Sequence, residues 1–324
     1  MAWNHTKKNK KKQQKKLLKA IFGKSLPLVL LIVLVAFAAC DYLYDTNEPF
    51  REFIDGLGIV STSNKAQYVD PNGDEMAVHF IDVGQGDSTL LQTPQGSVLI
   101  DCSVPEYGDD IVEYLNSVGV TELEYFIITH PDEDHMGAAA YVIENIDVKN
   151  VVMNGQTKNT KFFEKTLDAM EEKGIEGIIV QPNDVLTVGA LQMRILGPQR
   201  LDFSDAEWNN ASIIIHATYG NRAFLFTGDA EEEGEEDLLD AYRGSINCDV
   251  FSAGHHGSRT SNSPALLEAA TPEYVVISCG DGNSYGHPHQ EALDAFADVG
   301  ATVFRTDKDG TIVFVTDGDA LTKK

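Results

Sequence analysis

The stretch Thr129-His130-Pro131-Asp132-Glu133-Asp134-His135 places four potential metal ligands within six residues. It directly follows the apolar run 125–128, which predicts a strand that ends at this point. A turn after a strand lets positions i, i+2, i+4 and i+5 converge on one cleft, and imidazole with carboxylate suits Zn, Mn or Fe. The alternative for this stretch alone is a polar turn whose His130 and Asp134 cap the next helix.

Three further polar clusters also follow apolar runs. They are Thr227-Gly228-Asp229, Gly254-His255-His256-Gly257-Ser258-Arg259-Thr260 and Tyr285-Gly286-His287-Pro288-His289. Asp229 taken alone is typical of a helix cap. Six of the nine histidines, however, fall in the loops at 130–135, 254–260 and 280–289, so the clusters together predict a metal-dependent active site. His79 and His216 lie inside predicted strands, where we expect packing or surface roles.

Strand-length apolar runs alternate with helical patterns from Met76 to Phe314. The predicted strands cover 76–82, 88–93, 97–101, 124–129, 149–153, 177–181, 191–196, 212–218, 222–227, 248–253, 274–279, 301–305 and 311–315. The predicted helices lie near 109–118, 136–145, 161–173, 231–242, 263–270 and 290–298. The first three strands follow one another through short turns before helices interleave. This order favours an α/β fold with mixed sheets flanked by helices.

Charge is divided sharply between the N-terminus and the rest of the chain. Of 324 residues, the first 25 hold nine Lys and no Asp or Glu. This leaves 16 basic and 50 acidic residues over 26–324, a net charge of −34. Such a surface excludes a broad basic face that binds nucleic acid. A polyanionic substrate would need a small cationic site, such as bound metal.

The apolar run 26–39 predicts a signal or anchor segment. Its 14 residues are fewer than the roughly 20 of a spanning helix and typical of a signal peptide, and the basic flank should stay cytoplasmic. Phe37-Ala38-Ala39-Cys40 resembles the cleavage box of bacterial lipoproteins, in which Cys40 would be lipidated; an uncleaved anchor is the alternative. Both place residues 41–324 outside the cytoplasmic membrane, either attached to it or secreted.

These observations predict five parts of the chain. They are a basic cytoplasmic segment (1–25), a signal or anchor segment (26–40), a tether (41–75), a domain with the predicted metal-dependent active site (76–318) and a tail (319–324).

Seven motifs occur in a fixed order over about residues 76–316. They are Phe80-Ile81-Asp82-Val83-Gly84-Gln85-Gly86-Asp87-Ser88, Leu99-Ile100-Asp101, the 130–135 motif, Asn209-Asn210-Ala211-Ser212, Thr227-Gly228-Asp229, His255-His256-Gly257-Ser258 and Gly286-His287-Pro288-His289. In this order they resemble the metallo-β-lactamase superfamily, and within it the nuclease-like domain of competence DNA-internalisation (ComEC-type) proteins. The resemblance implies a four-layer αββα sandwich with metal ions at the sheet edges.

The resemblance also implies one or two divalent metal ions, Zn or Mn. His130 and Asp132 would bind one ion, and Asp229 would bridge it to a second ion. The ligands of that second ion would be Asp134, His135 and His255. The superfamily's usual further histidine, between the 130–135 motif and Asp229, is absent, which weakens the first site.

Other residues receive roles from the same resemblance. Asn210, in the position of the missing histidine, and His287 are candidates for contact with metal or substrate. Asp101 and Asp87 would lie behind the ligands and hold the loops in place. For catalysis, Asp134 would orient a metal-bound hydroxide, and His256, His287 or His289 would protonate the leaving oxygen. Ser258 and Arg259 would hold a phosphate oxygen.

The expected function is an extracytoplasmic, metal-dependent phosphodiesterase or nuclease that acts on weakly bound DNA. Asp132 and the missing histidine disfavour β-lactamase activity. The alternatives are a hydrolase of another ester, a thioester or a lactone on the same fold, and a binding module with a degenerate site. The N-terminal segment would be the contact with the membrane, and the oligomeric state is left open.

Overall fold

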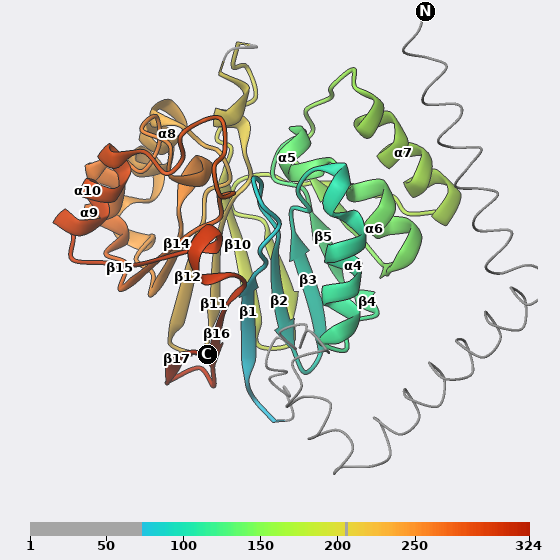
Figure 1. Cartoon of the computed structure of the whole chain (residues 1–324), viewed down its shortest axis with the longest axis horizontal. Helices are drawn as coiled ribbons and strands as arrows, with labels where there is room; N and C mark the ends of the chain where they lie inside the picture. The colour runs from blue at the N-terminus through green and yellow to red at the C-terminus, as the bar shows by residue number, and fades with distance from the viewer. Residues whose placement is uncertain (1–72, 205–206) are drawn as a thin grey trace, which may run out of the picture. The chain divides into compact units, whose positions relative to one another are not determined.

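The computed structural model describes residues 73–204 and 207–324, whose long strands form two mixed sheets (Figure 1). The first sheet has the order β17-β16-β1-β2-β3-β5-β7-β8. Its strands are β1 (Met76–Phe80), β2 (Thr89–Thr93), β3 (Gly96–Ile100), β5 (Tyr125–Ile127), β7 (Val151–Met153), β8 (Gly177–Ile179), β16 (Ile312–Thr316) and β17 (Leu321–Lys323). β17 lies in the predicted C-terminal tail, where it pairs antiparallel with β16.

The second sheet has the order β15-β14-β13-β12-β11-β10-β9. Its strands are β9 (Val185–Val188), β10 (Leu191–Gly197), β11 (Ile214–Tyr219), β12 (Arg222–Phe226), β13 (Val250–Ser252), β14 (Tyr274–Ile277) and β15 (Thr302–Arg305). Neighbours from β9 to β12 run antiparallel, and neighbours from β12 to β15 run parallel. A separate parallel pair consists of β4 (Glu122–Leu123) and β6 (Asp147–Val148).

Helices cover the outer face of each sheet, which gives four layers (Figure 1). On the first sheet lie α4 (Gly108–Ser117), α5 (Glu133–Met136), α6 (Ala139–Asn145) and α7 (Lys161–Lys173). On the second sheet lie α8 (Glu232–Tyr242), α9 (Pro264–Ala270) and α10 (Gln290–Asp298), and the short α11 (Thr306–Asp309) follows β15. The αββα sandwich expected from the resemblance is therefore present in the described residues. Among their helices, none is both long and apolar enough to span a membrane.

Three buried apolar clusters correspond to the three interfaces between these layers. Phe80, Phe226 and Phe314 belong to the central cluster between the two sheets, and the ring of Phe80 lies against the other two rings. Every residue of β1 and β16 is buried, which explains why their apolar residues do not alternate with exposed polar ones. Burial of the three clusters fixes the two sheets against each other, and the sheet edges become a rigid base for the loops.

Local signals explain where individual helices begin and end. The Thr160 side chain caps α7 by accepting a hydrogen bond from the Phe163 amide, and Gly174 ends the helix with φ of 69°. The helix predicted near 136–145 corresponds to α6, which begins at Ala139, and the separate short helix α5 ends at Met136, just before Gly137. A Cβ at Gly137 would lie 2.8 Å from the Val104 Cα, so the chain must pass close to another loop at this point. The predicted N-terminal segments and most of the tether lie outside the described residues.

Candidate metal centre

The polar clusters meet because the strands that precede them run in parallel. Asp101 directly follows β3, and the 130–135 motif follows β5, its parallel neighbour. Asp229 follows β12, and the pair His255 and His256 follows β13, again a parallel neighbour. The carboxyl ends of parallel strands lie at the same edge of a sheet, so each sheet delivers part of the site to the seam between them.

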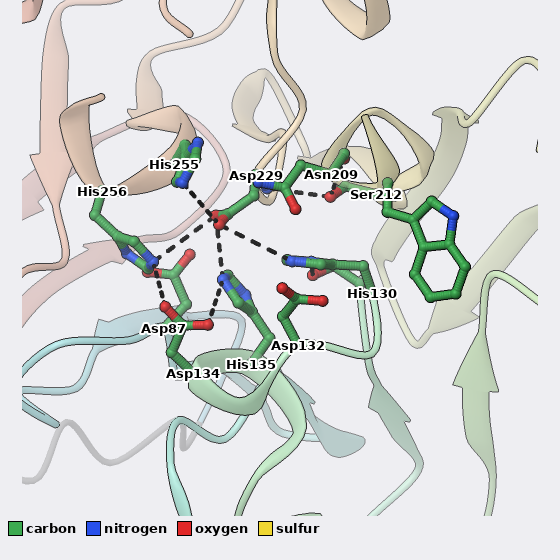
Figure 2. Close-up of polar contacts among 12 residues, drawn as sticks. Asp87, His130, Asp132, Asp134, His135, Asn209, Ser212, Asp229, His255 and His256 are labelled. Atoms are coloured by element: carbon green, nitrogen blue, oxygen red, sulfur yellow. Dashed lines mark hydrogen bonds and ion pairs between the residues drawn. The ribbon is translucent and has the colours of Figure 1, made fainter. Parts of the chain in front are cut away.

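Asp229 lies at the centre of the cluster (Figure 2). Its Oδ1 is 3.1 Å from His135 Nε2 and 3.8 Å from His256 Nε2. Its Oδ2 is 3.6 Å from His255 Nε2 and 3.9 Å from His130 Nε2. The two oxygens therefore face different pairs of histidines, as a carboxylate between two cationic positions would.

The Oδ1 side of Asp229 is the better-formed half of the cluster. Asp134 Oδ2 is 3.3 Å from His256 Nε2, and its Oδ1 is 4.0 Å from His135 Nε2. Ligand atoms of Asp134, His135 and His256 lie within 4.8 Å of one another, and a further group of this kind joins Asp87, Asp229 and His256. This half thus offers two imidazole nitrogens and the carboxylates of Asp134 and Asp229 around one point.

The ligand atoms of this half are buried and point inward without partners. His135 Nε2, His256 Nε2 and Asp229 Oδ1 have no hydrogen-bond partner, although buried polar atoms normally have one. The opposite ring nitrogens are bonded: His135 Nδ1 donates to Asp101 Oδ2 at 2.9 Å, and His256 Nδ1 donates to the Ser278 carbonyl at 3.0 Å. These bonds turn the Nε2 lone pairs toward the centre, which is how metal-ligating histidines are held. These residues therefore fit a divalent metal ion.

The charges of the cluster also favour a cation at its centre. Burial opposes ionisation, yet the carboxylates led by Asp229 raise the pKa of His135 and His256 well above the usual value. The histidines in turn hold the pKa of Asp134 and Asp229 below the usual range. His130 differs, because burial and the neighbouring His135 lower its pKa to about 4. A neutral His130 keeps its nitrogen available as a ligand.

Backbone strain is concentrated in the same loops. His255 and His256 have φ of 50° and 54°, and Asp101 has φ of 58°, in the left-handed region that favours glycine. Each such residue costs of order 1–3 kcal/mol, and such residues cluster at functional sites. The strained backbone of Asp101 places its carboxylate against the 130–135 loop. There the carboxylate accepts hydrogen bonds from the Thr129 amide and hydroxyl and from His135.

The other half of the cluster is less complete. Asp132, expected beside His130 as a ligand, forms an ion pair with Lys158 instead. Within the described residues, no close group of three ligand atoms contains Asp132, or joins His130 to His255. Lys158 belongs to a loop that sequence reasoning did not select, because a lysine is not a metal ligand at neutral pH.

His255 is held at one side of the cluster by a chain of polar side chains. Its Nδ1 lies 3.2 Å from Glu231 Oε1. The Thr260 hydroxyl donates to that same oxygen at 3.1 Å and pairs with the Ser258 hydroxyl at 3.0 Å. Ser258 was expected to hold a phosphate oxygen. It is only 4% exposed, and its hydroxyl is hydrogen-bonded to Thr260 inside its own loop. Sequence reasoning missed Glu231 as the partner of His255.

Asn210 does not point into the cluster. Its Oδ1 accepts hydrogen bonds from the amides of Glu231 and Gly234, each at 2.9 Å, and so caps α8 from outside the helix. This geometry does not support its expected contact with metal or substrate. Ser212 lies nearer, with its Oγ accepting from the Asp229 amide at 3.2 Å.

The remaining expected residues surround the cluster. Asp87 Oδ1 lies 3.5 Å from His256 Nδ1, behind that ring. The ring of His287 is 5.5 Å from His255 and 4.8 Å from His289, between centroids. Arg259 is exposed; its guanidinium is 3.4 Å from Glu291 Oε1, and its amide donates to His289 Nδ1.

A four-layer αββα sandwich with buried His and Asp gathered at its sheet edges defines a class of metal-dependent hydrolases. The model of the metallo-beta-lactamase superfamily matches residues 81–281. This chain belongs to that superfamily and is homologous to ComEC-type competence proteins.

Individual relatives agree with this assignment. The chain is 33% identical over 258 residues to ComE operon protein 3 of Bacillus subtilis, covering 74% of this chain and 33% of that protein. It is 31% identical over 247 residues to competence protein ComA of Neisseria gonorrhoeae, covering 74% of this chain and 32% of that protein. The chain thus spans about a third of these relatives.

Among solved structures, the metallo-beta-lactamase fold protein YhfI of Bacillus subtilis has the same fold. The match has a TM-score of 0.52 and 15% identity, and covers 75% of this chain and 100% of YhfI.

Proposed function

We propose that this chain is a metal-dependent phosphodiesterase that cleaves DNA. The observation that carries the proposal is the buried group of Asp134, His135, Asp229 and His256 with inward-facing, unpartnered ligand atoms. Within residues 73–204 and 207–324, no Lys or Arg pairs with Asp134 or Asp229. The relatives support DNA as the substrate, since they are named for competence and, in Haemophilus influenzae, for recombination.

A divalent ion in this group supplies Lewis-acid stabilisation of a phosphoryl group and makes a water acidic near neutral pH. The chain's own residues provide the placement. Asp101 keeps the Nδ1 proton of His135 in place, and the Ser278 carbonyl does the same for His256. Both histidines are thereby pre-set as acceptors through Nε2, and little reorganisation is needed when substrate binds.

His256 rather than His255 is proposed as the ligand, which exchanges the roles expected from the sequence. His256 is buried with Nε2 toward Asp134 and Asp229, whereas His255 faces the other oxygen of Asp229. Glu231 Oε1 lies 3.2 Å from His255 Nδ1 and would stabilise the protonated ring, so Nε2 of His255 could deliver a proton to the leaving oxygen.

Binding of DNA is proposed to be weak and dominated by the metal centre. The net charge of −34 over residues 26–324 repels a polyanion, so long-range attraction would not assist association. Short single strands, which bring fewer phosphates near the acidic surface, are the expected substrates.

The location outside the cytoplasmic membrane is proposed from the sequence of residues 1–40. Protease added to intact spheroplasts would digest residues 41–324 if they lie outside, and would leave them intact if they lie in the cytoplasm.

The proposal is tested with the full chain, purified in mild detergent without chelator. Bound metal is counted by mass spectrometry, and cleavage of single- and double-stranded DNA is measured with added Mn or Zn. Asp134→Ala should abolish cleavage, while Asp298→Ala, an exposed aspartate at the end of α10, should not. Bound metal with cleavage of carboxyl esters but not of DNA would refute the phosphodiesterase proposal.

The exchanged roles of the two histidines are tested separately. His256→Gln should lose bound metal, because it removes a ligand. His255→Gln should keep the metal and lower kcat about 100-fold, within the usual range for a general acid. The opposite pattern of metal loss would restore the assignment expected from the sequence.

A further inference from the structure

The loop after β7 is fastened to the turn η3 (Trp208–Ala211) by side-chain amides. Asn154 is 2% exposed, and its Nδ2 donates to the Ala211 carbonyl at 2.8 Å and to Gln156 Oε1 at 2.7 Å. Gln156 Nε2 donates to the Trp208 carbonyl at 3.3 Å. These side-chain hydrogen bonds hold the loop in place as far as Gln156, two residues before Lys158.

Lys158 extends from this loop to the cluster. Its ammonium pairs with Asp132 and lies 5.8 Å from the centroid of the Trp208 ring, within the range of a cation–π contact. Its side chain is 30% exposed. An ammonium has three donors, so two remain for another acceptor after the bond to Asp132.

The residues expected to hold the first metal ion do not fit one. Asp132 is paired with Lys158, and among the ion pairs of the described residues His130 meets a carboxylate only at the shared Asp229, 3.9 Å from its Nε2. The segment that would carry a further histidine instead provides Asn210, which caps α8. The close group that contains His130 also consists of His135 and Asp229, which already belong to the other half. A second divalent ion would therefore face a fixed positive charge with His130 as its one unshared ligand in that group, whereas a catalytic site normally supplies three protein ligands.

We propose that Lys158 takes the place of the first metal ion, so that the chain binds a single divalent ion and Lys158 binds an anionic oxygen of the phosphate substrate. The ion occupies the half formed by Asp134, His135, Asp229 and His256. Lysine is a compact point charge that suits a phosphate oxygen. The choice of substrate rests on the proposed function, whereas the metal count does not.

Metal stoichiometry tests the first part of the proposal. The full chain is titrated with Mn and followed by electron paramagnetic resonance and by equilibrium dialysis. We expect one ion per chain and the spectrum of an isolated Mn ion. Two ions per chain, or the spectrum of a coupled pair, would overturn the proposal.

Anion binding tests the second part without turnover. The affinity of the metal-loaded chain for inorganic phosphate is measured by calorimetry. Lys158→Gln should weaken it at least tenfold with the Mn affinity unchanged, and Lys158→Arg should recover part of it. Lys161→Gln, an exposed lysine three positions further along, is the matched control and should bind like the wild type.

Turnover gives a third measurement with a separate meaning. For a DNA substrate, Lys158→Gln should lower kcat/KM about 100-fold. A loss below threefold in both kcat/KM and phosphate affinity would overturn the role of Lys158. If no phosphodiester is cleaved by the wild type, the proposed function fails, and the metal count and phosphate affinity still decide the proposal for Lys158.

Discussion

Replacing Asn210 with alanine is expected to destabilise α8 and to leave the metal centre intact. The Oδ1 of Asn210 accepts hydrogen bonds from two amides at the N-terminus of that helix, those of Glu231 and Gly234. Gly234 is buried, and a Cβ there would lie only 3.0 Å from the same oxygen. Asn210→Ala removes this oxygen, so the buried amide of Gly234 loses its acceptor.

The size of the effect follows from the two donors. A buried donor left without a partner costs about 1–3 kcal/mol, and the loss of an N-terminal helix cap costs about 1 kcal/mol. Because Glu231 is partly exposed and its amide can be rehydrated, we expect a decrease in the free energy of unfolding of about 2–4 kcal/mol. In a domain of this size, that corresponds to a fall in Tm of about 5–12 °C.

Urea denaturation of the full chain, with metal counted in the folded state, measures both quantities. The matched control is Asn209→Ala, whose side chain forms no hydrogen bond within the described residues; its stability should change by at most about 0.5 kcal/mol. An unchanged urea midpoint in Asn210→Ala, together with the loss of a bound ion, would refute the reasoning and make Asn210 a ligand.

Three further measurements test other parts of the structure. Asp101→Ala removes the hydrogen-bond partner of His135 Nδ1, so we expect metal affinity to fall about 10–100-fold. Competition with a chelating dye measures this affinity, and an unchanged value would show that Asp101 does not orient the His135 ring for metal binding. Burial lowers the pKa of His79 from 6.5 to about 4, so the unfolded state binds more protons between these values and stability falls as the pH is lowered through this window. At pH 5 the free energy of unfolding should be about 2 kcal/mol lower for this reason. Urea midpoints at pH 7 and pH 5 should show this decrease in the wild type and not in His79→Leu, and an equal decrease in both proteins would mean that other groups cause it. Chelation of metal that had been present at about 100 times its Kd should cost about 2.7 kcal/mol, seen in calorimetry as a fall in Tm of about 5–10 °C, whereas an unchanged Tm would mean that the folded chain held no ion.

Strongly patterned segments could be predicted from the sequence. The range 161–173 coincides with α7, because a threonine cap and a terminal glycine mark both ends. The 191–196 and 222–227 runs correspond to β10 and β12 within one residue at each end. The strand β9 was missed because it is a short strand at the edge of its sheet with half-exposed side chains, and such strands carry a weak apolar signal.

Strand direction accounts for part of the arrangement of the site. Asp101 and the 130–135 motif follow parallel neighbours in one sheet, and Asp229 and His255 follow parallel neighbours in the other, so the proximity of the loops within each pair could be inferred from where their strands end. The orientation of His255 against His256 could not, because it depends on two consecutive residues in the left-handed region. Lys158 was also out of reach, since its position depends on hydrogen bonds between Asn154 and a segment more than fifty residues away.

The return of the last strands to the first sheet has a consequence for how the chain folds during synthesis. β1 lies between β2 and β16, and Met76 pairs with Thr316, 240 positions later. Until those residues leave the ribosome, one edge of an apolar strand stays open, and such an edge can pair with other chains. Pairing across so long a stretch is also intrinsically slow. A nascent chain of this protein therefore depends on protection of β1 for most of its synthesis, and truncation before residue 312 would leave a product prone to aggregation.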